Sequence, residues 1–284
     1  MGVKIITDST AYIDVRTLKE LDITVIPLSV HFPDVYYKET EVDYEEFYRQ
    51  IEREGIIPTS SQPARGEVDG ILARTVRGGD DVLAIFISSE MSGTYHSALK
   101  AREMILQDYP GVRIRIVDSR TNCMAMGLTV IAAARAAREG KTLEEIEEIA
   151  YQSMLRTKFY FVPKGLEYLK KGGRIGGAAA LLGSILQIKP ILYVLDGKTA
   201  LLERVRGQRA AIGRMLKLLD DDYERYGIRM VMVHHISCPD EAVQLAQTIA
   251  DRYGLKVSTH PIGPVIGLHV GPGTLAIVYC TENY

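Results

Sequence analysis

The sequence predicts an α/β protein of two domains, an N-terminal α/β/α layered domain over residues 1–157 and a C-terminal α+β domain over residues 158–284. Short apolar runs that end in Ser or Asp, with helical patterns between them, predict the first domain. A denser set of strand candidates and the hairpin dipeptide Asp196-Gly197 predict the second. We expect a mostly parallel sheet in the N-terminal domain and a mixed or antiparallel sheet in the C-terminal one.

Continuous rather than alternating apolar runs characterise the N-terminal strands. Such runs are typical of parallel strands that helices cover on both faces. The alternation of strands with helices indicates right-handed crossover connections between parallel strands. Strands are predicted at residues 3–7, 23–32, 82–87 and 112–117, and helices at 15–21, 44–54, 67–77, 94–108 and 124–139.

A further helix leads into the C-terminal domain. Thr142 and Glu145 have the spacing of a capping box, in which each side chain bonds the other residue's backbone N–H. After this helix we expect six strands, at residues 159–162, 191–195, 201–205, 229–234, 257–262 and 275–280. Helices are predicted near residues 165–171, 178–186, 208–223 and 240–253.

Charge and composition exclude several classes of protein. The chain of 284 residues has 34 Lys and Arg against 36 Asp and Glu, which gives a formal net charge of −2. Without a general basic field, we expect no nucleic-acid partner. No apolar run is long enough to span a bilayer, and the beginning of the sequence lacks a signal-peptide pattern. We therefore expect a cytoplasmic protein.

The cysteines give no indication of a metal or redox site. Cys123, Cys238 and Cys280 are widely spaced and form neither a CxxC pair nor a zinc spacing, so we expect reduced thiols. Two Gly-Lys-Thr segments, at residues 140–142 and 197–199, lack the leading glycine of a phosphate-binding loop. We accordingly expect no metal and no cofactor.

Hydroxyl-bearing turns follow the predicted strands. They are Asp8-Ser9-Thr10, residues 58–63, residues 88–94 and Asp118-Ser119-Arg120. Ligands of open α/β sheets bind outside the carboxyl ends of the strands. Ser92-Gly93-Thr94 also opens a helix, whose N-terminal N–H groups favour an anion. Helix capping explains each turn taken alone, whereas four turns at one edge favour a site for a carboxylate or a phosphate.

A glycine-rich apolar segment near the C-terminus is a second candidate. Residues 262–273 contain four glycines, with His269 as the only imidazole. Glycines allow a backbone to lie close to another group. We expect a loop here and weigh two roles for His269, a hydrogen-bonded core residue or a ligand contact.

A basic, glycine-rich turn over residues 169–177 is a third candidate. Lys170, Lys171 and Gly172 are typical of a helix C-terminus. Capping gives no reason for Arg174 between two pairs of glycines, so this turn is also a candidate docking surface for an anionic partner.

In this order, the motifs resemble those of the DegV family of bacterial proteins. The resemblance covers nearly the whole chain and is carried by residues 7–10, 60–63, 92–95, 117–120, 169–175 and 263–273. It implies a DegV-like fold of two α/β domains with a long-chain, palmitate-like fatty acid in a tunnel between them. It further implies a subunit of fatty acid kinase that presents the acyl carboxylate to a separate ATP-dependent kinase subunit, with acyl phosphate released for phospholipid synthesis. Only transient contact with a membrane surface is expected.

The resemblance also assigns roles to individual residues. Ser92 would donate its hydroxyl to the carboxylate, with Gly93 and Thr94 beside it, and His269 would lie near the carboxylate directly or through water. The family's Thr-Ser-Gln-Pro threonine falls on Ser60, so the neighbouring hydroxyls of Thr59 or Ser61 are substitutes. Arg174 and Arg206 match the family's kinase-docking surface, although Gly207 replaces the usual threonine after Arg206. No catalytic residue is assigned to this chain.

Two other functions are compatible with the motifs. A serine hydrolase would use Ser92 as nucleophile, His269 as base and Asp8 as the orienting acid, although the sequence lacks the Gly-x-Ser-x-Gly motif. A binding module for a phosphorylated small molecule would use the N-terminus of the helix after Ser92, and would leave the apolar segment 263–273 without a use.

Overall fold

The computed structural model describes residues 2–181 and 188–284 and divides the chain into two compact units. Unit 1 comprises Met1–Val30, Tyr36–Thr40 and Ser60–Leu155. Unit 2 comprises His31–Val35, Glu41–Thr59 and Arg156–Tyr284. Unit 2 includes two segments from the N-terminal part of the chain, so no single position in the sequence separates the two units. The predicted boundary after residue 157 stays a prediction.

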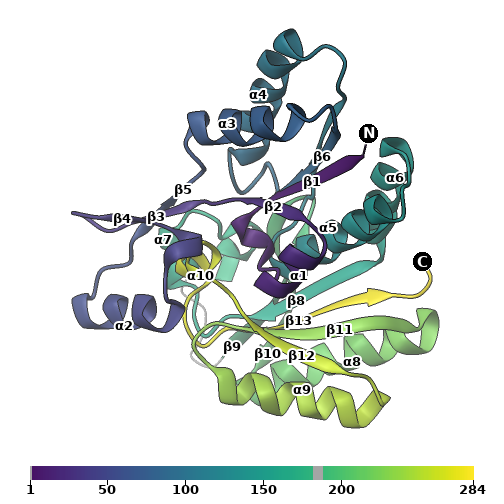
Figure 1. Ribbon diagram of the computed structural model, residues 1–284. Helices are drawn as coiled ribbons and strands as arrows, with labels where there is room; N and C mark the ends of the chain where they lie inside the picture. Colours follow the sequence, from purple (N-terminus) through teal and green to yellow (C-terminus); the bar gives the residue numbers. More distant parts are fainter. Residues whose placement is uncertain (1, 182–187) are drawn as a thin grey trace. The chain divides into compact units, whose positions relative to one another are not determined.

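A four-stranded parallel sheet forms the centre of unit 1 (Figure 1). Each neighbouring pair of strands is parallel, as the continuous apolar runs predict. The central strand β6 is buried along its whole length, which requires helices on both faces. In spatial order the strands are β2 (Ile23–Ile26), β1 (Val3–Asp8), β6 (Asp81–Phe86) and β7 (Ile114–Asp118).

Helices cover both faces of this sheet. α3 (Arg65–Val76) and α4 (Thr94–Asp108) share one apolar core with Ile6 and Phe86 of the strands. α5 (Cys123–Arg138) packs against β1 and β6 outside that core, and its residues from Cys123 to Val130 are all buried. Unit 1 is therefore the α/β/α layered domain that the sequence predicts. Its other helices are α1 (Val15–Glu20), α6 (Leu143–Arg156) and the short 3-10 turns η1 (Ser9–Ala11) and η2 (Glu39–Glu41).

The predicted capping box at the start of α6 is confirmed. The backbone N–H of Thr142 donates to the Glu145 carboxylate at 2.8 Å, and the N–H of Glu145 donates to the Thr142 hydroxyl at 3.3 Å. These reciprocal bonds satisfy two donors that a helix N-terminus otherwise leaves open.

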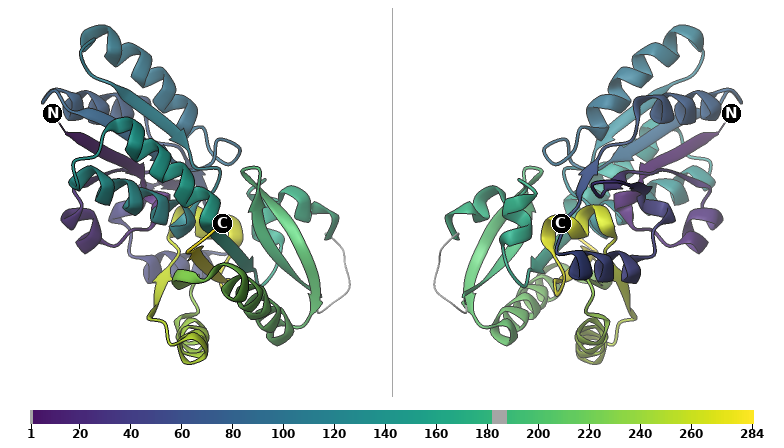
Figure 2. Two further views of the ribbon diagram at one scale, coloured as in Figure 1. Left: turned by 90° about the vertical axis from the view of Figure 1, so that its right-hand side faces the viewer. Right: turned by 90° about the vertical axis from the view of Figure 1, so that its left-hand side faces the viewer.

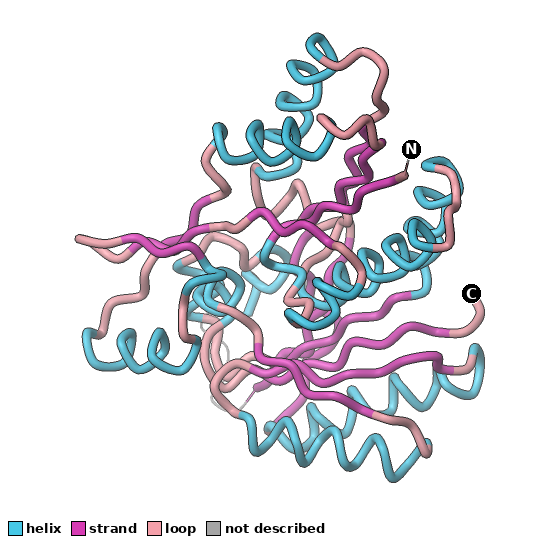
Figure 3. The backbone as a smooth tube through the Cα atoms, in the orientation of Figure 1, coloured by secondary structure: helices cyan, strands magenta, loops and turns pink. Residues whose placement is uncertain are grey.

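A six-stranded mixed sheet forms the centre of unit 2. Only β11 and β12 pair in parallel, and the other neighbours are antiparallel, which confirms the predicted mixed sheet. α8 (Gln208–Tyr226) and α9 (Pro239–Tyr253) pack on the same face of the sheet (Figure 3). In spatial order the strands are β10 (Lys198–Arg206), β9 (Ile188–Leu195), β8 (Thr157–Val162), β13 (Leu275–Thr281), β11 (Ile228–His235) and β12 (Val257–Pro261).

The hairpin predicted at Asp196-Gly197 joins β9 to β10. Both residues have positive φ, 50° and 80°, as a two-residue hairpin turn with the favoured twist requires. The 3-10 segment η3 (Gly176–Leu181) lies alongside this hairpin (Figure 2). A helix was predicted at residues 178–186, but its first residues belong to the 3-10 segment η3, so the predicted type of helix was wrong there. Residues 182–186 lie outside the described residues.

Two local predictions were wrong. Residues 59–61, expected in a turn, form the short strand β5 (Thr59–Ser61) beside β3 (Ser29–His31), which also pairs with β4 (Tyr36–Lys38). Their partner lies about thirty residues away, so no local pattern indicates it. The glycine-rich segment 263–273, expected as a loop, contains the helix α10 (Pro264–Val270), since Pro264 occupies a first-turn position and the apolar residues between the glycines are buried.

Two further helices belong to unit 2, α2 (Tyr44–Glu54) and α7 (Glu167–Lys171). α2 buries Phe47, Tyr48 and Ile51, and Phe47 packs edge-on against both Phe32 and Tyr48. Within the part of the chain that the structure describes, no helix has the length and apolar composition to cross a membrane.

The capping box allows a first test. Replacing Thr142 by Ala removes the side-chain acceptor for the Glu145 N–H, and we expect the free energy of unfolding to fall by about 1 kcal/mol. Urea denaturation followed by circular dichroism measures the change. Thr248→Ala, in the exposed middle of α9, is the control and should stay within about 0.5 kcal/mol of the parent. An equal loss in both variants would contradict the assignment.

Candidate functional site

Three of the four hydroxyl-bearing turns lie at one edge of the parallel sheet. β1, β6 and β7 run in the same direction, so the segments after Asp8, Phe86 and Asp118 all leave from the carboxyl edge. This placement confirms the expectation for those three turns. The fourth hydroxyl-rich segment belongs to β5 instead and approaches the same edge through Gln62, as described below.

Asp8 ties the ends of β1 and β6 together. Its carboxylate is fully buried and accepts hydrogen bonds from the Thr10 backbone N–H at 3.0 Å, the Thr10 hydroxyl, and the Ile87 N–H at 2.8 Å. Burial raises the pKa of Asp8 to about 6, although these hydrogen bonds act in the opposite direction. Its described partners belong to the fold, so the structure gives no contact that supports Asp8 as the orienting acid of a hydrolase.

The loop after β6 is fixed to the loop after β7. The Ser89 N–H and hydroxyl both donate to Asp118, at 3.1 and 2.5 Å, and the Ser88 N–H donates to the Thr121 carbonyl at 2.9 Å. The Arg120 guanidinium lies 3.5 Å from the same aspartate. The carboxylate of Asp118 is therefore neutralised by its own loop rather than directed at a ligand.

Ser92 occupies the turn that opens α4. Its hydroxyl oxygen lies 2.9 Å from the Thr94 hydroxyl and accepts from the Thr94 N–H at 3.3 Å. Thr94 is fully buried whereas Ser92 is half-buried, so Thr94 holds Ser92 in place and Ser92 is the hydroxyl that a ligand can reach. Because the N-cap residue is Gly93, the cap bond of α4 comes from the neutral Ser92 hydroxyl, and the first turn holds no acidic residue to offset the positive end of the helix dipole.

Gln62 attaches the Ser60-Ser61 segment to this turn. Its side-chain amide donates to the Ser97 hydroxyl of α4 at 2.8 Å. Its amide oxygen lies only 1.9 Å from the place that a Cβ on Gly93 would occupy. Glycine at position 93 therefore makes room for Gln62. Ser60 and Ser61 are half-buried and directly precede Gln62, so this bond and this contact attach the end of their segment to the beginning of α4. Sequence reasoning missed Gln62, although its position directly after two candidate serines was a usable signal.

In unit 2, His269 lies against the basic turn. The imidazole Nδ1 is 2.1 Å from the place where a Cβ on Gly172 would be, so glycine is required at the end of α7 for α10 to pack there. Burial lowers the pKa of His269 to about 4, and the positive charge of Arg174 acts in the same direction. His269 is therefore neutral at pH 7. The structure brings His269 and Arg174 together, which the sequence does not predict.

The other glycines of residues 263–273 also face side chains of unit 2. A Cβ on Gly267 would lie 1.6 Å from the Tyr48 hydroxyl, and one on Gly271 would lie 2.6 Å from the Tyr168 ring. Gly271 additionally has a φ of 92°. The inference that these glycines permit close approach is confirmed, and at these positions the approaching groups are tyrosines of the protein itself.

The two candidate docking arginines lie apart. Both are exposed, and the Arg174 guanidinium donates to the Gly172 carbonyl at 2.6 Å. Gly176, two residues after Arg174, touches Thr199 near the beginning of β10. Arg206 is the last residue of that strand, roughly 20 Å further along at the rise of a β-strand. The structure thus groups Arg174 with His269 and not with Arg206.

Comparison with known proteins assigns the family. The model of the DegV family, described as uncharacterised proteins, matches residues 2–282. The chain belongs to the DegV family. A DegV domain-containing protein of Clostridium acetobutylicum is 45% identical over 283 residues, which cover 100% of this chain and 99% of that protein.

Solved DegV structures have the same fold. The crystal structure of DegV from Bacillus subtilis, a fatty acid binding protein, has a TM-score of 0.90 at 32% identity and covers 99% of both chains. A stearic acid-binding protein from Eubacterium ventriosum has a TM-score of 0.89 at 26% identity, covering 99% of this chain and 98% of that one. The predicted DegV-like α/β fold of two domains is confirmed.

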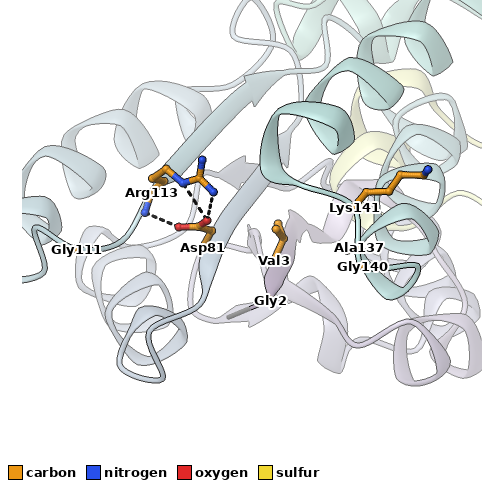
Figure 4. A pocket seen from close by; sticks show the side chains of 8 residues that line it. All are labelled: Gly2, Val3, Asp81, Gly111, Arg113, Ala137, Gly140 and Lys141. Atoms are coloured by element: carbon orange, nitrogen blue, oxygen red, sulfur yellow. Dashed lines mark hydrogen bonds and ion pairs between the residues drawn. The ribbon is translucent and has the colours of Figure 1, made fainter.

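A pocket of about 320 Å³ lies at the opposite, amino edge of the parallel sheet (Figure 4). Arg113 and Lys141 line it, but the Arg113 guanidinium donates to Asp81 at 2.6 Å and to Glu144 at 2.8 Å. Lys141 lies 3.9 Å from the carboxylate of Glu139. Because carboxylates offset both cations, this DegV protein has no surplus of positive charge in the pocket to hold an anion.

No metal site is indicated. Among residues 2–181 and 188–284, no group of three or more His, Cys, Asp or Glu side chains is arranged to hold a metal ion. Burial raises the pKa of the Cys123 thiol well above its ordinary value, so this residue is a buried thiol and not a reactive one.

The buried Asp8 predicts a pH dependence of stability. Its pKa in the folded protein, about 6, exceeds the ordinary value of 3.8, so the folded state binds a proton more tightly than the unfolded state. The stability that this proton contributes is present below pH 4 and is lost as the pH rises through 6, by a total on the order of 3 kcal/mol. The Asp8→Asn variant should have a lower free energy of unfolding than the parent and should lack this part of the dependence on pH.

Urea denaturation at several pH values between about 3.5 and 7 measures how the free energy of unfolding changes with pH, which is the slope compared here between variants. Asp22→Asn, at an exposed residue paired with Lys4, is the matched control and should keep it. If Asp8→Asn and the parent protein have the same slope between pH 4 and 6, the proposed titration of Asp8 is wrong.

Proposed function

We propose that this chain binds a long-chain, palmitate-like fatty acid and holds its carboxylate at the carboxyl edge of the unit 1 sheet. The observation that carries the proposal is the half-buried Ser92 hydroxyl at the N-terminus of α4, whose first turn holds no acidic residue. Ser60 or Ser61, anchored beside it through Gln62, supplies a second hydroxyl. The fatty acid binding of solved DegV relatives supports the same ligand class.

Neutral donors suit this ligand. A carboxylate removed from water is costly unless several hydrogen bonds replace its hydration. The Ser92 hydroxyl and the backbone N–H of Gly93 would be donors without a fixed cation, and the helix dipole adds a partial positive charge. Such donors hold the carboxylate in register, yet they leave its oxygens more nucleophilic than a bidentate arginine would.

The acyl chain supplies the affinity. Burial of one methylene contributes about 0.8 kcal/mol, so a sixteen-carbon chain offers on the order of 10 kcal/mol before ordering costs. The head group contributes selectivity for an acid. The tunnel between the two domains that the DegV resemblance implies stays a prediction.

We further propose that the chain presents the carboxylate to a separate ATP-dependent kinase subunit. In that reaction a carboxylate oxygen attacks the γ-phosphorus of ATP held by the partner, the bond to the β-phosphate oxygen breaks, and acyl phosphate and ADP leave. The chain itself supplies no catalytic residue and remains a cytoplasmic carrier for phospholipid synthesis with transient membrane contact. Arg174 and Arg206 would contact the kinase subunit, and a neutral His269 would lie near the carboxylate, directly or through water.

Ser92 provides the direct test of the binding site. Ser92→Ala removes one hydrogen bond to a charged group, for which we expect a roughly tenfold higher Kd for palmitate. The Kd for hexadecanol should change less, because an alcohol carries no charge. Titration with a fluorescent fatty acid and competition by each ligand measure both values, with the exposed Ser258→Ala in unit 2 as the control.

Analysis of the lipid that the purified protein retains tests fatty acid binding independently of any substitution. Lipid should co-purify with the parent protein and be identified by mass spectrometry after organic extraction. A protein that retains no lipid and shows no affinity for palmitate is not a fatty acid carrier. Turnover of acyl esters that Ser92→Ala abolishes would instead favour the hydrolase hypothesis.

The kinase role predicts a separation of effects. With a kinase subunit from the same organism, ATP and palmitate, Arg174→Ala should lower the kcat/KM of acyl phosphate formation at least tenfold while the Kd for palmitate stays within twofold. Arg77→Ala, at an exposed arginine of unit 1, is the control. Formation of acyl phosphate by the chain alone, or none with the partner present, would contradict the proposed role.

A further inference from the structure

Asn122 lies at the same edge of the sheet as Ser92 and is not among the ligand contacts that the sequence predicts. It follows the loop after β7 and is the N-cap residue of α5. Its side-chain Nδ2 lies 3.0 Å from the sulfur of Met91, the residue directly before Ser92. The Ser88–Thr121 backbone bond holds the two loops together at this point. Asn122 therefore faces the turn that carries Ser92.

The amide of Asn122 is poorly used by the protein. Asn122 is only 7% exposed, and its Oδ1 has no hydrogen-bond partner among the described residues. Its Nδ2 donates to a thioether sulfur, which is a weak acceptor. A buried amide with one unsatisfied atom and one weak bond costs free energy, so such a group in a native protein calls for an explanation.

Helix capping does not supply that explanation. Asparagine is among the best N-cap residues, yet Asn122 makes no side-chain cap bond to α5. The N-termini of α4 and α5, helices of 15 and 16 residues, lie at the same edge, and neither has an acidic residue in its first turn. The amide is turned away from its own helix and towards the loop of Met91 and Ser92.

We propose that Asn122 is a further head-group residue, whose side-chain amide hydrogen bonds the carboxylate of the bound fatty acid. This inference rests on the proposed function and extends it. A half-turn of the amide about the Cβ–Cγ bond exchanges Nδ2 and Oδ1, so the weak bond to the Met91 sulfur is given up and Oδ1 faces that sulfur instead. The amide then donates to a carboxylate oxygen, a strong acceptor. Asn122 thereby selects an acid over an ester or an alcohol.

The charges around Asn122 are consistent with this role. Asp118 accepts hydrogen bonds from Ser89 and Arg120, and Asp8 accepts them from Thr10 and Ile87. The buried Glu39, whose charge acts on the neighbouring Cys123, accepts hydrogen bonds from the Ser9 and Tyr12 hydroxyls. The positive ends of two helix dipoles favour an anion beside Asn122. A neutral amide adds a donor without the cation that would hold the carboxylate too firmly.

The sharpest test introduces a charge without changing the shape. Asn122→Asp places a second carboxyl group beside that of palmitate, and two adjacent carboxylates cannot both ionise readily. Palmitate binding then requires the uptake of a proton. We expect the Kd for palmitate to rise with pH, by up to about tenfold per pH unit, between the pKa of the free carboxyl groups and the pKa of the proton that they share in the complex. The parent and Asn283→Asp should show no such slope. The Kd for hexadecanol should stay within twofold.

A second variant guards against misfolding. Asn122→Leu keeps the volume and removes both polar atoms, and should raise the Kd for palmitate about fivefold with hexadecanol unchanged. Circular dichroism and urea denaturation verify the fold of each variant. Parent-like palmitate binding in both variants, or an equal loss for both ligands, overturns the inference and leaves Asn122 a structural residue. If the parent protein itself binds no palmitate, the proposed function fails with it.

Discussion

The candidate site depends on the parallel pairing of β1, β6 and β7. Parallel pairing places the carboxyl ends of these three adjacent strands at one edge, and the buried Asp8 carboxylate joins two of these ends by accepting hydrogen bonds from Thr10 and Ile87. The loops after β6 and β7 are then joined through Ser89 and Asp118. Each loop is thus held by backbone and hydroxyl donors before any ligand binds, which is the condition for a preorganised site.

The parts of the fold that the sequence predicts are those with local causes. The bounds of α4 and α2 agree with their periodic patterns, Thr142 and Glu145 form the expected box, and Asp196-Gly197 forms the expected turn. What escaped prediction depends on partners far away in the chain. The strand β5 exists because it pairs with β3, and the anchor from Gln62 to Ser97 exists because α4 passes beside it.

Glycine-rich segments also show that a sequence pattern does not identify contacts between residues distant in the chain. The pattern of residues 263–273 correctly predicts that something lies close to the backbone, but it does not identify that group. In the structure Tyr48 and Tyr168 fill the space at Gly267 and Gly271, whereas His269 fills it at Gly172. A glycine that makes room for a tyrosine and one that makes room for a ligand look alike in a single sequence, because both record only the absence of a Cβ.

The electrostatics of the edge follow from these constraints. Asp8 and Asp118 already accept hydrogen bonds from the loops at this edge, Asp8 from Thr10 and Ile87 and Asp118 from Ser89. The remaining attraction for an anion comes from short-range donors and the ends of two helices, which act over a turn or less. Such a site selects by geometry more than by long-range charge. For the fatty acid that we propose as the ligand, the acyl chain would therefore supply most of the binding free energy, and the donors would decide which end of the molecule lies at the edge.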